Sequence, residues 1–394
     1  MKRILIGILA FAMCCMCFPV GSAARAENGV SILDENAFAA YALCDFASGQ
    51  IIASKNGDTV CQNVGLSQMM SLLLFFDALE KGEFKLEEEI TISEHAASQT
   101  GPQMFLDKGG HYPVKELLKG VIMVSANDAC VALCERLAGS TSEFVELMNE
   151  KAKLIGMNHT VFTDPTGYFA DQECTTANDL ARLARELCKY PALFDYTSLW
   201  QESIIHNDGR ITELVNANRL IKQNAKCDGL AVGSSAPTGY SIAATAKQDD
   251  GRFILIGIGA NNSKERFKAA GNALDFAFNA YETKIFVKSG QIVKRDFLVP
   301  GATQQPSALY AKEDVAVVVK KGEAGLCEKV IELYDNIELP LHPGDSVGRL
   351  IITLNGKTIG GTNLLINNDL FEISFGYAFH KVCANWLQMQ QEAH

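Results

Sequence analysis

Apolar and polar residues alternate near both ends of the chain and follow a helical period between them. Residues 37–56 alternate around Ser48-Gly49, which is typical of a β-hairpin with glycine at its turn. Apolar residues recur every three or four positions over 66–81 and 114–138, which predicts helices. Further along the chain, alternation predicts strands over 229–233, 239–246 and 252–259.

Three further segments carry the marks of helices. Thr141-Ser142 precedes an amphipathic run that ends at Gly156, which predicts a capped helix. Residues 179–190 form a helical pattern that Pro191 closes, and 264–282 is also helix-like. Strands that flank a helical middle indicate an α+β domain, in which helices lie on either side of an antiparallel sheet.

The pattern of apolar and polar residues changes after residue 283. Short alternating runs are separated by turns at Pro343-Gly344-Asp345 and Asn355-Gly356, which predicts a small all-β domain over 284–370. The last segment, 373–390, has apolar residues at helical spacing and predicts an amphipathic helix. The apolar positions of this helix are Phe375, Phe379, Val382, Cys383, Trp386 and Met389.

The first 26 residues have the pattern of a signal peptide. Lys2-Arg3 are followed by an apolar run and by an A-x-A cleavage site at Ala24-Arg25-Ala26. This predicts an exported protein that begins at Glu27, with a lipoprotein or an uncleaved anchor as minor alternatives. The net charge of −11 becomes −14 when the three cations of this acid-free segment are removed, which argues against nucleic acid as a partner.

Nine cysteines follow the signal segment, an odd number for an exported protein. Most occupy apolar positions, so we interpret them as buried thiols rather than as a disulfide framework. Cys130 and Cys134 lie one helical turn apart, but no further cysteine or histidine pair completes a zinc set. The seven histidines are dispersed. The sequence therefore predicts no metal site and no cofactor.

Three segments carry candidate chemistry: VKELLKGVIMVSANDACVALCERLAG (114–139), SLLLFFDALEKGEFKLEEEITISEHAAS (71–98) and CDGLAVGSSAPTGYSIAATAKQDDGRFILIGIGA (227–260). In order and spacing they resemble the serine D-alanyl-D-alanine carboxypeptidases, the low-molecular-mass penicillin-binding proteins. That family acts through S-x-x-K, S-x-N and K-T-G motifs. Here S-x-N is intact as Ser125-Ala126-Asn127, whereas the resemblance places Gly65 at the nucleophile and Gln68 at the lysine base. Ala231-Val232-Gly233 occupies the K-T-G position.

These replacements remove the groups that perform acyl transfer. Gly65 has no oxygen, and the amide of Gln68 cannot take up a proton at neutral pH. Ala231 cannot hold a substrate carboxylate. Ser67 is an alternative nucleophile, but Met70 follows it at the position of a base, and two residues along a helix turn a side chain by roughly 200°.

Part of the binding apparatus is retained. The resemblance implies an oxyanion hole made of backbone N–H groups, here from Gly65 and Ser234, which do not depend on side chains. With Ser125 and Asn127 this predicts a pocket that binds a peptide end without cleaving it. The alternative is that Ser125 and Asn127 only hydrogen-bond internal segments of the domain.

The resemblance implies a β-lactamase/transpeptidase-like domain over 30–282, a non-catalytic β-sandwich and a terminal helix on the membrane surface. Trp386 suits a membrane surface, although packing on the sandwich or on a partner is the alternative. We favour a non-catalytic extracytoplasmic protein, associated with membrane or cell wall, that binds peptidoglycan stem peptides or a cell-wall synthesis protein. An active serine carboxypeptidase using Ser67 or Ser125, and a purely structural subunit, are the alternatives.

Overall fold

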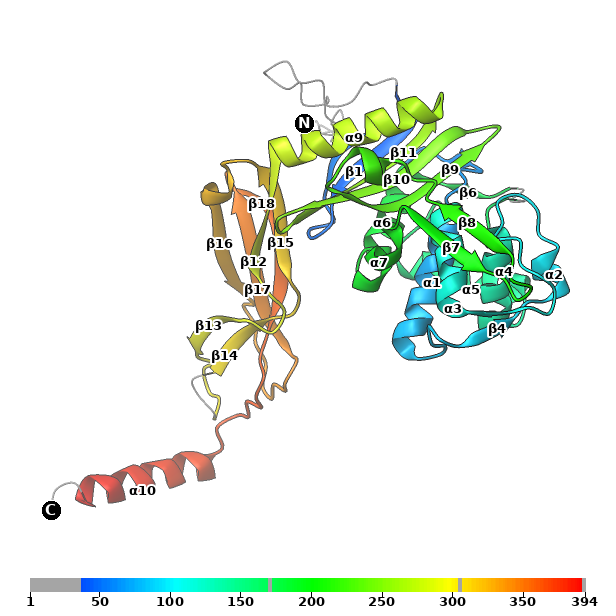
Figure 1. Cartoon of the computed structure of the whole chain (residues 1–394). Coiled ribbons are helices and arrows are strands. Elements are labelled where there is room, and N and C mark those ends of the chain that lie inside the picture. Colours follow the sequence, from blue (N-terminus) through cyan, green and yellow to red (C-terminus); the bar gives the residue numbers. More distant parts are fainter. Residues whose placement is uncertain (1–36, 169–171, 304–306, 392–394) are drawn as a thin grey trace, which may run out of the picture. The chain divides into compact units, whose positions relative to one another are not determined.

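The computed structural model describes residues 37–168, 172–303 and 307–391 (Figure 1). The predicted signal peptide, 1–26, lies outside the described residues. Among the helices that are described, none has the length and apolar character needed to cross a membrane.

An antiparallel sheet of five strands, in the order β2-β1-β11-β10-β9, forms the frame of the first domain. The strands are β1 (Ala40–Asp45), β2 (Ile51–Lys55), β9 (Cys227–Ser235), β10 (Gly239–Gln248) and β11 (Gly251–Ala260). All five strands predicted here are present, and Gly49 takes the left-handed conformation that the hairpin turn requires (φ 71°). Helix α9 (Ser263–Ala280) covers one face of the sheet and α6 (Ala177–Leu187) lies against the other (Figure 1).

A group of helices packs beside this sheet around one large apolar core. The main helices are α1 (Gln68–Lys81), α3 (Val114–Val124), α4 (Asn127–Ala138) and α5 (Thr141–Leu154). The prediction of helical structure over 114–138 is confirmed with one break, because Ser125 adopts a left-handed conformation (φ 56°) that ends α3. The cap of α5 is Ser140, whose hydroxyl accepts a hydrogen bond from the Glu143 amide, rather than Thr141-Ser142.

Several small elements that the sequence analysis did not predict complete this domain. The largest is an antiparallel hairpin of β7 (Gln201–Ile205) and β8 (Ile211–Val215). The others are β3 (Cys61–Gln62), β4 (Glu89–Thr91), β5 (His111–Pro113), β6 (Cys174–Thr175), α2 (Glu94–Ala97), α7 (Phe194–Thr197), α8 (Leu220–Gln223) and the 3₁₀ turn η1 (Pro191–Leu193).

The predicted all-β domain is present and has an apolar core of its own. One sheet of five strands has the order β13-β14-β18-β17-β16, and a second pairs β12 with β15. The bounds are β12 (Tyr281–Val287), β13 (Ile292–Phe297), β14 (Ser307–Ala311), β15 (Val315–Lys320), η2 (Ala324–Leu326), β16 (Cys327–Leu333), β17 (Ser346–Leu354) and β18 (Lys357–Leu365). The terminal helix α10 spans Phe375–Gln391.

Candidate functional site

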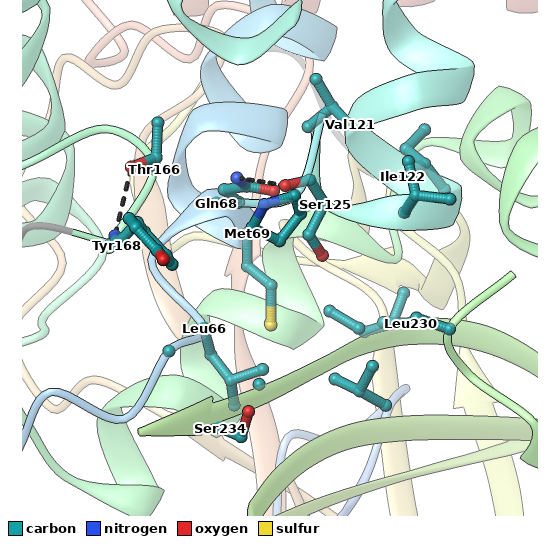
Figure 2. A pocket seen from close by; sticks show the side chains of 18 of the residues that line it. Leu66, Gln68, Met69, Val121, Ile122, Ser125, Thr166, Tyr168, Leu230 and Ser234 are labelled. Carbon is teal, nitrogen blue, oxygen red and sulfur yellow. Dashed lines mark hydrogen bonds between the residues drawn. The ribbon is translucent and has the colours of Figure 1, made fainter. Parts of the chain in front are cut away.

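A cavity of about 330 Å³ lies between the start of α1, the junction of α3 with α4, and strand β9. Figure 2 shows its walls, with Gln68 and Ser125 on one side and Leu230 and Ser234 on the other. The site positions expected from the sequence all line it: Gly65, Gln68, Ser125, Asn127, Ala231, Val232, Gly233 and Ser234. The structure therefore brings three segments that are distant in sequence to one place.

Gly65 sits in a backbone conformation that depends on glycine. Its φ angle is 74°, in the left-handed region that residues with side chains rarely adopt. A β-carbon at this position would lie 3.1 Å from the backbone nitrogen of Ser234. Across the contact, a β-carbon at Gly233 would collide with the Gly65 carbonyl oxygen. The two glycines thus allow the backbones at 65 and 233 to approach closely.

Gln68 ties the floor of the cavity to its S-x-N segment. Its Nε2 donates to the Ser125 carbonyl oxygen at 3.1 Å and to Asn127 Oδ1 at 3.1 Å. A protonated lysine at this position would have donors for the same two acceptors. Gln68 therefore makes two contacts that a protonated lysine could also make, but it offers no base.

Ser125 and Asn127 differ in what their side chains do. Asn127 is buried, and its Nδ2 donates to the Thr100 carbonyl oxygen at 2.7 Å while its Oδ1 accepts from Gln68. Its backbone N–H also donates to Pro102 O, so Asn127 holds the 98–105 loop against α4. The Ser125 hydroxyl is partly exposed in the cavity and forms no hydrogen bond to any described residue. Of the pair, only Ser125 is free to meet a ligand with its side chain.

Arg266 is a cavity residue that the sequence analysis did not identify. It belongs to the first turn of α9, is 6% exposed, and forms no ion pair with any described carboxylate. Its Nη1 donates to the carbonyl oxygens of Gly233 (2.9 Å) and Ser241 (3.1 Å). Burial lowers the pKa of the guanidinium to about 10, so it stays charged at neutral pH. A buried cation without an acidic partner favours an anionic ligand.

Ser67 does not face this cavity. It is 2% exposed, and its hydroxyl donates to Oε1 of Glu173, which is itself 3% exposed. Burial raises the pKa of the Glu173 carboxyl to about 7, against an opposing effect of the Ser67 hydrogen bond. Ser67 is thus packed away from the cavity, which does not favour it as the alternative nucleophile.

The described part of the cavity wall contains no lysine, histidine or carboxylate that could act as a base. Its ionisable side chains are Tyr168, Tyr240 and Arg266. The nine cysteines of the described chain are free thiols, and burial raises the pKa of Cys44, Cys188 and Cys227 to about 12. Such thiols are inert as nucleophiles at neutral pH. No group of three or more His, Cys, Asp or Glu residues within the described ranges could hold a metal ion.

Comparison with known protein families gives two matches along the chain. A family model described as D-alanyl-D-alanine carboxypeptidase matches residues 27–262. The model of the penicillin-binding protein 5 C-terminal domain matches residues 281–372.

Individual relatives cover most of the chain. D-alanyl-D-alanine carboxypeptidase DacF of Bacillus subtilis (strain 168) is 33% identical over 391 residues, which are 99% of this chain and 100% of the relative. DacC of Escherichia coli (strain K12) is 30% identical over 348 residues, 85% of each chain. The crystal structure of penicillin-binding protein 5 from Haemophilus influenzae has a TM-score of 0.78 at 28% identity, covering 85% of this chain and 98% of that one.

Proposed function

Because the chain belongs to the D-alanyl-D-alanine carboxypeptidase family of cell-wall metabolism, we propose that it binds the ends of peptidoglycan stem peptides without hydrolysing them. The family identifies the ligand class, a peptide that ends in D-alanyl-D-alanine. The cavity supports binding without catalysis, because it retains groups that can hold a peptide end and lacks a nucleophile with a base beside it.

This proposal rests on one observation: the same cavity contains the positive charge of Arg266 but has no side chain at Gly65. Arg266 offers an uncompensated positive charge, which suits the terminal carboxylate of a peptide. Gly65 closes the nucleophile's position with backbone atoms of Gly233 and Ser234. Ligand binding and chemistry are thus separable here, since each depends on different residues.

A binding measurement with two ligands tests the proposal. We expect N-acetyl-D-alanyl-D-alanine to bind at least about tenfold more tightly than its C-terminal carboxamide, because the amide removes the charge that faces Arg266. NMR titration of the mature protein, residues 27–394, measures both dissociation constants. Equal affinity of acid and amide would contradict a role for Arg266. Absence of binding by either ligand would contradict the proposed function itself.

A matched pair of variants locates the effect. Arg266→Met should abolish the preference for the free acid. Arg295→Met removes an exposed arginine from β13, in the all-β domain, and should leave the preference unchanged.

Hydrolysis by Ser125 is the second candidate function, since its hydroxyl lies in the cavity and has no hydrogen-bond partner among the described residues. Gln68 is the polar side chain hydrogen-bonded to the Ser125 backbone, and it cannot accept the hydroxyl proton. A purely structural subunit would bind neither peptide in the titration above.

We further propose that the protein is exported and contacts a membrane surface through α10. The proposed export signal is 1–26. The apolar face of α10 is open to solvent, with Phe375, Phe379, Val382 and Trp386 between 62% and 86% exposed. An aromatic face of this kind suits the interface of a bilayer.

Deletion of 373–394 tests this contact. We expect the truncated protein to leave the membrane fraction of cells, whereas the full chain stays in it. Because Lys381 is the one Lys or Arg of α10, the binding should change little with salt. Retention of the truncated protein on membranes would show that another segment provides the anchor.

A further inference from the structure

The hydrogen-bonding capacity of Gln68 is only half used by the protein. Both hydrogen bonds of its Nε2 go to acceptors of the S-x-N segment, Ser125 O and Asn127 Oδ1. Its Oε1 is buried and has no partner among the described residues, in a side chain that is 9% exposed. An unpaired buried acceptor is unfavourable, so this oxygen is poised for a donor that the protein itself does not supply.

The location of Gln68 Oε1 indicates which group of a ligand could donate a hydrogen bond to it. Gln68 lines the same cavity as Arg266, so a peptide whose carboxylate lies near the guanidinium brings its last amide N–H into the cavity with it. We propose that Gln68 Oε1 accepts a hydrogen bond from this N–H and so makes the site selective for a terminal amide over a terminal ester. The inference rests on the proposed function, because it requires that the cavity binds a peptide end.

The comparison with lysine shows why the selectivity would belong to this chain. A protonated lysine at position 68 donates to Ser125 O and Asn127 Oδ1 but has no acceptor to offer a ligand. Glutamine satisfies the same two partners and adds one acceptor. In the ester, an oxygen with lone pairs replaces the N–H and would face Gln68 Oε1, so a favourable contact becomes a repulsive one.

The experiment compares N-acetyl-D-alanyl-D-alanine with N-acetyl-D-alanyl-D-lactate, which differ at the N–H alone and both keep the carboxylate. We expect the wild-type mature protein to bind the amide about tenfold or more tightly than the ester in an NMR titration. Equal affinities for the two ligands would overturn the role of Gln68 and leave the proposed function intact. Failure of both ligands to bind would contradict the proposed function instead.

Two variants and a control assign the selectivity to one atom. Gln68→Met removes the acceptor and both donors, whereas Gln68→Lys removes the acceptor but still satisfies Ser125 O and Asn127 Oδ1. We expect the ratio of the two affinities to fall to about one in both variants, even where Gln68→Lys tightens binding of both carboxylates. Gln62→Met, an exposed glutamine of β3 outside the cavity, should keep the wild-type ratio. A tenfold ratio that persists in the folded Gln68→Lys protein would overturn the inference.

Discussion

Incubation of a protein of residues 27–394 with a fluorescent penicillin is expected to leave its intact mass unchanged. Acylation by a penicillin needs a nucleophilic oxygen with a base beside it. The described residues that line the cavity include no lysine, histidine or carboxylate that could serve a serine as its base. Gly65 has no side chain, the Ser67 hydroxyl is buried on Glu173, and Ser125 has Gln68 where a lysine would be needed. Intact mass spectrometry measures the outcome directly.

The conformation of Gly65 leads us to expect no acylation even in a variant that carries the family's residues at the altered positions. Gly65→Ser places a β-carbon in a left-handed backbone, which costs roughly 1–2 kcal/mol, and 3.1 Å from the Ser234 nitrogen. We therefore expect the triple variant Gly65→Ser, Gln68→Lys and Ala231→Lys to remain unacylated and to be less stable than the parent. The expected lack of acylation then has a cause in the backbone as well as in the side chains.

Penicillin-binding protein 5 of Haemophilus influenzae, treated in parallel, is the positive control. A stoichiometric adduct on this chain would contradict the non-catalytic proposal, and the labelled peptide would name the nucleophile. An adduct on the triple variant alone would confirm that residues 65, 68 and 231 occupy the positions of the family's nucleophile and lysines. It would also show that the backbone at Gly65 can rearrange.

The elements that local patterns specify could be predicted from the sequence. The alternation in 37–56 and in the three later segments predicted strands, and the structure pairs them as one sheet whose central strands β1, β10 and β11 are largely buried on both faces. The cavity positions followed from spacing between family-like segments, which the fold keeps together. The break at Ser125 was not predicted because apolar spacing continues through it. It depends on long-range contacts, such as the hydrogen bond from Asn127 N to Pro102 O.

Arg266 and Glu173 had no signal in the sequence. An arginine in the first turn of an amphipathic helix is usually solvated, and Arg266 is buried only because β9 and β10 present carbonyl oxygens to it. Glu173 lies just ahead of the two-residue strand β6, where an acidic residue is ordinarily exposed. Both residues are buried by segments that are distant in sequence and that meet only in the folded chain. Their burial therefore could not be predicted from local sequence patterns.

Glu173 gives the folded protein a pH dependence opposite to that of most carboxylates. Glu173 is 3% exposed. Its Oε1 accepts a hydrogen bond from the Ser67 hydroxyl, and its Oε2 has no partner among the described residues. Burial raises its pKa from 4.5 to about 7, with a further contribution from Asp164. The folded state therefore holds a proton between these values that the unfolded state has already lost.

The sign and size of the effect follow from linkage. Below pH 4.5 both states are protonated and Glu173 causes no loss of stability. As the pH rises to about 7 and beyond, unfolding becomes more favourable by up to about 3 kcal/mol, since each pKa unit corresponds to about 1.4 kcal/mol. Protonation of the Glu173 carboxyl thus stabilises the folded state.

Glu173→Gln should remove this dependence, because the amide keeps a hydrogen-bonding partner for Ser67 and never ionises. We expect urea unfolding to show the variant about 2–3 kcal/mol more stable relative to wild type at pH 8 than at pH 4.5. The comparison must be between variants, since burial lowers the pKa of His206 and makes the protein less stable as the pH falls. The exposed Glu146→Gln variant is the control and should show no such difference. Parallel pH profiles for wild type and Glu173→Gln would mean that folding does not raise the pKa of the Glu173 carboxyl.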